Sequence, residues 1–140
     1  MPDLKYQIDR HEGYTVIHAQ GKTRPGLFTA VSHALFEAMQ PGKFIEDAPQ
    51  NQRSFSFEDE SSEALLAKMV DEGIRVASDH KEACQELRLN LITDKKVEGS
   101  FMACEVTHFD SPLKESDKAS ISVKKDEATG EWQAEIRISQ

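Results

Sequence analysis

Residues 21–39, GKTRPGLFTAVSHALFEAM, decide the fold, because they predict a turn followed by one strongly amphipathic helix. Thr23 suits the N-cap position, since its side-chain oxygen can accept a hydrogen bond from the free amides of the first turn. Pro25 falls within that turn, where its missing N–H costs little. Apolar residues then recur at steps of three and four, namely Leu27, Val31, Ala34, Leu35, Ala38 and Met39. We expect this stripe to pack on an apolar surface, and Pro41 and Gly42 to end the helix.

A second helix is predicted in the middle of the chain. Residues 59–62 are acidic and hydroxyl-rich, which is typical of a helix entry. The apolar stripe that follows comprises Leu65, Leu66, Met69, Val70, Ile74 and Ala77, and it ends near residues 78–80. Gly73 lies inside this helix at a cost of ~1 kcal/mol relative to Ala, so we interpret it as a point of close packing.

Two-residue alternation predicts strands on both sides of these helices. The predicted strands cover residues 6–10, 14–20, 53–57, a segment from 86 onward, 100–108, 119–123 and 132–138. Short connections between the later strands imply antiparallel pairing. The expected fold is a two-layer α+β domain over residues 1–140, with two amphipathic helices on one face of a mostly antiparallel sheet of about seven strands.

Charge and composition limit the classes of function. The chain of 140 residues carries a formal net charge of −8, which argues against direct nucleic-acid binding, since that affinity depends on Lys and Arg. No apolar run approaches the roughly 20 residues that cross a bilayer. The first residues contain no apolar signal segment, so we expect a cytoplasmic protein without a membrane partner. Cys84 and Cys104 lack ligand spacing, and we interpret both as buried free thiols.

The sequence contains no phosphate-binding loop, nucleophile elbow or metalloprotease motif. The candidates for chemistry are Asp9, His11 and Glu12 in the first turn, whose oxygen ligands would suit calcium or magnesium, and His18 in the next strand. Solvated polar side chains are the simpler interpretation of that turn. His108 is either a ligand or a turn histidine. We therefore predict no catalytic residue and no cofactor, and an enzyme is the least favoured class.

A resemblance to a known family begins near the N-terminus. Its residues are His11, the run IHAQG at 17–21 and the helix at 23–39, and these look like the N-terminal half of the archease family. The match continues through the second helix, from Ala64 onward, to a final hairpin with Trp132. The resemblance implies a two-layer α+β fold and a helper role. Archeases assist the RNA ligase of tRNA processing that joins 2′,3′-cyclic-phosphate and 5′-hydroxyl ends, promoting its GTP-dependent guanylylation, and have been described as chaperones for an RNA methyltransferase.

The chain departs from the family at its metal site. The family's opening motif, Asp-His-Thr-Ala-Asp, falls on residues 10–14, and its terminal acid falls on Ser139. Arg10 and Tyr14 replace the two opening acids, so that only the histidine remains. Because a hard cation needs several anionic oxygens, we predict that the metal site is lost. The residual pocket would then consist of Asp9, His11, Glu12 and His18.

We therefore predict an archease-like helper that acts by protein contact, with an RNA ligase or another RNA-modifying enzyme as its partner. The candidate contacts are acids flanking the second helix, Glu58, Asp59, Glu60 and Glu63, which would complement a basic RNA-binding surface. A solvated helix entry, favoured by the helix dipole, explains the same acids. The alternative function is a divergent fold-mate that dimerises or binds a small ligand, since a fold does not fix function.

Overall fold

The computed structural model describes residues 5–140, apart from the side chains of Lys118 and Ala119. The elements are β1 (Lys5–His11), β2 (Tyr14–Gly21), α1 (Arg24–Ala38), β3 (Asn51–Glu58), α2 (Ser62–His80), β4 (Glu82–Ile92), β5 (Lys96–Glu105), β6 (Glu115–Lys125) and β7 (Trp132–Ser139). The α+β class and the order of helices and strands are confirmed. Neither described helix has the length and apolarity that a membrane span requires.

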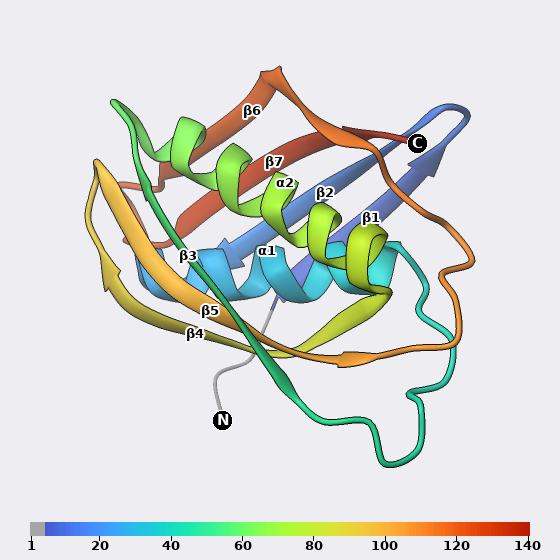
Figure 1. Ribbon diagram of the computed structural model, residues 1–140. Helices are drawn as coiled ribbons and strands as arrows, with labels where there is room; N and C mark the ends of the chain where they lie inside the picture. The colour runs from blue at the N-terminus through green and yellow to red at the C-terminus, as the bar shows by residue number, and fades with distance from the viewer. Residues whose placement is uncertain (1–4) are drawn as a thin grey trace.

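The strands form two antiparallel sheets, whereas we predicted one. The larger sheet has the order β1-β2-β7-β6 and the smaller has the order β3-β5-β4. Figure 1 shows both helices lying between the two sheets. α1 packs mainly on β2 and also reaches β4, while α2 packs on β6 and on all three strands of the smaller sheet. The helices therefore form an inner layer, and the expectation that both rest on one face of one sheet is wrong.

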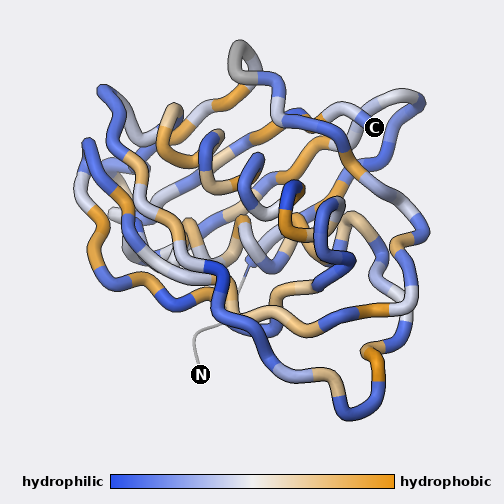
Figure 2. The backbone as a smooth tube through the Cα atoms, in the orientation of Figure 1, coloured by the Kyte–Doolittle hydropathy of each residue, from blue (hydrophilic) through white to orange (hydrophobic). Residues whose placement is uncertain are grey.

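Because both sheets cover α1, this helix is buried over more than the predicted stripe. Leu27 and Val31 of the stripe are fully buried, as we expected. The small residues Ala30 and Ser32 lie outside the stripe and are buried as well. Figure 2 shows the hydrophobic positions of the chain gathered toward the interior between the sheets. Small side chains let a second layer approach a helix closely, and they leave no strong apolar signal in the sequence.

The predicted helix entry and the predicted close packing point are both confirmed. Thr23 Oγ1 accepts a hydrogen bond from Gly26 N at 3.0 Å, as an N-cap should. A Cβ atom on Gly73 would lie 2.8 Å from Leu35 Cδ2 and 3.5 Å from the ring of Phe101. Any larger residue in α2 at this position would press on α1 and on the smaller sheet.

The strand boundaries differ from the prediction at the two ends of one hairpin. β4 begins at Glu82 rather than residue 86, because Lys81 has a φ of 53° and turns the chain directly from α2 into the sheet. β5 covers Lys96–Glu105 rather than residues 100–108, because the turn before it is tight: Thr93 N donates to Lys96 O at 2.8 Å. The alternation of apolar and polar side chains does not reveal where either strand begins.

Candidate functional site

Part of the predicted residual pocket comes together on the outer face of the larger sheet. Asp9 Oδ2 lies 3.1 Å from His18 Nε2, and Glu135 Oε1 of β7 lies 3.6 Å from His18 Nδ1. His18 and Glu135 also border a shallow polar hollow of about 450 Å³. The three side chains are 38% to 55% exposed, so the cluster is a set of solvated polar contacts of modest strength. Glu135 was not predicted from the sequence, because only the pairing of β2 with β7 brings it beside His18.

The other two members of that predicted pocket lie apart from His18. The ring of His11 stacks on Tyr14 with 4.6 Å between centroids, and the Arg137 guanidinium lies 3.8 Å over the same tyrosine ring. Glu12 is exposed in the turn between β1 and β2. The structure therefore separates the four predicted residues: Asp9 and His18 share a polar cluster, His11 stacks on Tyr14, and Glu12 is exposed in the turn.

The three positions expected to carry the family's metal-binding acids do not fit a divalent cation. Tyr14 and Ser139 are register partners on β2 and β7. Arg10 points to the opposite face, since alternate residues of a strand face opposite sides, and its Nη1 donates to Ala38 O at 2.8 Å. Arg137 lies over Tyr14 on the outer face, so the two guanidinium groups lie on opposite faces of the sheet. None of the three side chains, Arg10, Tyr14 and Ser139, supplies the anionic oxygen that a divalent cation needs.

Two further observations bear on chemistry within residues 5–140. No three His, Cys, Asp or Glu side chains in this part of the chain converge in a way that could hold a metal ion. Cys84 and Cys104 are free, as expected, but each is only partly buried. Burial raises the pKa of the Cys84 thiol to about 11, so this thiol stays protonated at neutral pH and is a poor nucleophile.

The acids predicted to contact a partner gather where β3 ends and α2 begins. Asp59 Oδ2 lies 3.1 Å from Lys68 Nζ, so its charge is partly compensated. Glu58 lies 3.4 Å from a lysine amine of β5, but its side chain is 74% exposed. Glu60 is exposed, and Glu63 occupies the first turn of α2, where its charge favours the helix dipole. Glu58 and Glu60 are therefore the members of this group most open to a partner.

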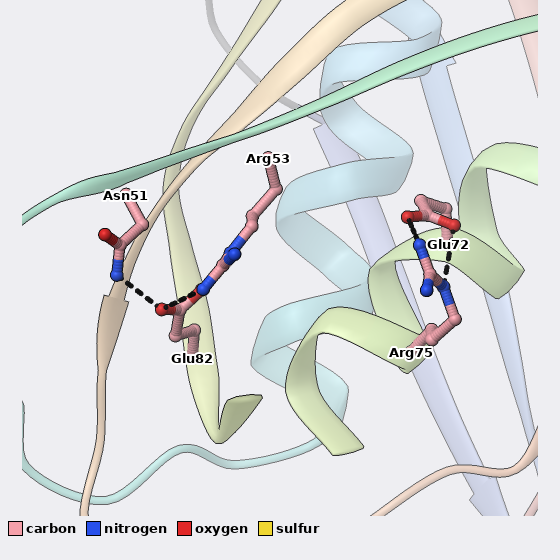
Figure 3. A network of polar contacts seen from close by, with 5 residues as sticks. All are labelled: Asn51, Arg53, Glu72, Arg75 and Glu82. Atoms are coloured by element: carbon pink, nitrogen blue, oxygen red, sulfur yellow. Dashed lines mark hydrogen bonds and ion pairs between the residues drawn. The ribbon is translucent and has the colours of Figure 1, made fainter. Parts of the chain in front are cut away.

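A buried ion pair links β3 to the start of β4, and sequence analysis did not predict it. Glu82 is only 3% exposed, and Arg53 holds both of its oxygens, with Nε 2.8 Å from Oε1 and Nη2 2.9 Å from Oε2. Asn51 Nδ2 donates to Oε2 at 2.6 Å (Figure 3). Burial alone would raise the pKa of Glu82, but the hydrogen bonds from Arg53 and Asn51 and the charge of Arg53 outweigh it and hold this pKa below its ordinary value. All its oxygens are engaged, so the carboxylate serves the fold rather than a ligand.

The chain is similar in sequence pattern and in fold to one family. The model of the Archease protein family (MTH1598/TM1083) matches residues 6–135. The crystal structure of an archease, possible chaperone (TM1083), from Thermotoga maritima matches with a TM-score of 0.62 and 10% identity, over 89% of each chain. The solution structure of Methanobacterium thermoautotrophicum protein 1598 matches with a TM-score of 0.60 and 14% identity, over 96% of this chain and 98% of that one. A search of curated protein sequences finds no significant match.

Proposed function

The chain belongs to the archease family, and from this premise we propose that it is a helper protein that acts by direct contact on RNA-processing machinery. The observation that carries the proposal is the family match over residues 6–135, which is nearly the whole chain. The description of the Thermotoga protein as a possible chaperone supports a role through contact with other proteins. The partner class that the family resemblance implies is the GTP-dependent RNA ligase.

The contact would use charge rather than a shared metal ion. Of the positions that the family resemblance assigns to metal-binding acids, one is Arg10, and another, Tyr14, lies beneath the guanidinium group of Arg137. The exposed acids Glu58 and Glu60 instead offer negative charge to a partner. An enzyme that handles RNA must present a basic surface to the phosphate backbone, and such a surface attracts acidic groups. The proposed helper therefore docks by electrostatic complementarity.

Guanylylation of the ligase tests the function directly. RNA ligase from the same organism is incubated with GTP, with and without this protein, and the covalent GMP–ligase adduct is measured over time. Faster adduct formation, at a substoichiometric or equimolar amount of the protein, supports the helper role. If the rate is unchanged and no complex forms at low salt, the helper role is wrong, and the dimerising or ligand-binding fold-mate becomes the favoured function.

A matched pair of variants tests the contact surface. Glu58→Lys with Glu60→Lys reverses charge at the proposed surface, and Glu12→Lys with Glu46→Lys makes the same change in net charge at exposed positions elsewhere. The first pair should weaken binding of the ligase by about tenfold, because two attractive interactions become repulsive. The control pair should weaken it much less. Equal weakening by both pairs would show that the surface at the start of α2 is not the contact.

A further inference from the structure

A pocket of about 300 Å³ lies at the C-terminal ends of both helices. Its inner wall consists of Met39, which caps α1, and Ile74 and Ala77 from the last turns of α2. Its outer wall is the segment 107–113, which crosses the two helix ends between β5 and β6. The pocket thus lies at a junction of three parts of the chain, where ligand sites are common.

The outer wall is fixed to the end of α1 by hydrogen bonds. Gly42 N donates to His108 O at 2.8 Å, and Asp110 N donates to Gln40 O at 3.0 Å. Ser111 adds two more bonds, from its N to Met39 O at 3.0 Å and from its Oγ to Gln40 Oε1 at 2.7 Å. A wall held at four points keeps its shape, so the pocket is preformed and a ligand would not have to order it.

The pocket has an apolar floor and a polar rim. Met39, Ile74 and Leu113 form much of the floor and are almost completely buried. The polar residues that line the pocket are Ser78, Lys81, Thr107 and His108. A pocket with an apolar floor and a polar rim favours a ligand that has an apolar body and a polar group at one end.

The charges at the rim indicate which polar group the ligand carries. The acid of the outer wall, Asp110, is engaged by His108, whose Nε2 lies 2.9 Å from Asp110 Oδ1. The other ring nitrogen, Nδ1, lies 2.9 Å from Thr107 Oγ1. Lys81 is exposed and makes no ion pair with any side chain in the described part of the chain. Lys81 is therefore the cationic group at the rim that no described acid engages.

We propose that this pocket binds a small amphipathic acid, with its apolar body on Met39, Ile74 and Leu113 and its carboxylate or sulfonate at Lys81. A volume of about 300 Å³ limits the ligand to a short aliphatic chain or a compact aromatic group. The site is separate from the acids at the start of α2. The proposal goes beyond the helper function and does not depend on it.

Fluorescence titration of the folded, full-length protein with 1-anilinonaphthalene-8-sulfonate tests this proposal. This probe joins an aromatic body to one anionic group, and its emission rises in an apolar site. We expect saturable binding of about one probe per chain.

Lys81→Gln should raise the dissociation constant at least threefold, because it removes the charge that pairs with the sulfonate. Ser78→Phe should abolish binding by filling the mouth. Lys124→Gln, on the larger sheet, should change nothing.

Competition separates the charge from the apolar body. Octanoate should displace the probe at lower concentration than octanol, and Lys81→Gln should remove that difference. Melting curves of every variant, recorded without the probe, exclude emission from partly unfolded protein. If no enhancement occurs up to millimolar probe, or if Lys81→Gln and Ser78→Phe bind as the wild type does, the proposal is wrong.

Discussion

Glu82 places a carboxylate that is only 3% exposed at the start of β4. We predict that Glu82→Gln lowers the free energy of unfolding at pH 7 by about 2 kcal/mol, because it leaves Arg53 without its bidentate partner. The cost is limited because the Arg53 side chain is 32% exposed and water can reach it. Chemical denaturation at pH 7 measures this change. Glu86→Gln, on the exposed face of the same strand, is the control and should cost less than about 0.5 kcal/mol.

The same carboxylate should make stability depend on pH in a definite direction. The pKa of Glu82 in the folded protein lies below its ordinary value of 4.5. Its charged form therefore stabilises the fold at pH values above 4.5, and this contribution is lost as the pH falls through the folded-state pKa. The difference between wild type and Glu82→Gln should accordingly shrink in acid. A difference that is the same at pH 7 and pH 3 would contradict the assignment of the ion pair.

The sequence identified polar residues of the candidate site, but it did not show which of them contact one another. The sequence indicated that Asp9 and His18 are polar residues of neighbouring strands, and the structure brings them within 3.1 Å. Glu135 lies more than a hundred residues from His18 along the chain, and no local sequence pattern indicates that β7 pairs with β2. Such long-range pairing depends on how all the strands pack together, so residue spacing cannot specify it.

At the scale of elements, both helices were predicted correctly, and their surroundings were not. Periodicity and the N-cap located α1 and α2 to within a few residues. The apolar stripe gave the face of α1 that packs on β2, but the buried Ala30 and Ser32 on its other side are too small to give a signal. A helix between two sheets therefore looks, in sequence, like a helix on one sheet.

The buried position of the helices leads to a prediction about stability. Val31→Asp in α1 should cost about 4 kcal/mol or more, because Val31 is completely buried and the new carboxylate would have no partner. Leu66→Asp in α2 should have a similar effect for the same reason. His33→Asp lies on the exposed side of α1 and should change the melting temperature by only a degree or two. If Val31→Asp melts as the wild type does, α1 is not packed as described.

At the scale of the whole molecule, the division of seven strands into two sheets is the feature that sequence analysis missed. Alternation identifies the face of a strand that turns inward, and both sheets turn their inward faces toward the same helices. One sheet of seven strands and two sheets of four and three strands therefore give the same pattern along the chain. The family resemblance could supply the number and order of elements, and the pairing had to come from the structure.

The net charge of the whole molecule leads to the last prediction, which concerns the rate of association with a basic partner. With a net charge of −8, the protein should be attracted at long range to the basic RNA-binding surface of the proposed ligase partner. Salt shortens that reach, since the Debye length falls from about 10 Å at 0.1 M ionic strength to about 3 Å at 1 M. The association rate constant, measured by stopped flow, should therefore fall at least tenfold between low salt and 0.5 M salt. The melting temperature, which depends on apolar burial, should change little.

The net charge is reduced equally by the pair Glu58→Lys with Glu60→Lys and by the control pair Glu12→Lys with Glu46→Lys. If long-range attraction alone sets the rate, both pairs will slow association to the same extent. If the surface at the start of α2 also orients the complex, the first pair will slow it more, and a salt-independent rate for all proteins would exclude electrostatic docking altogether.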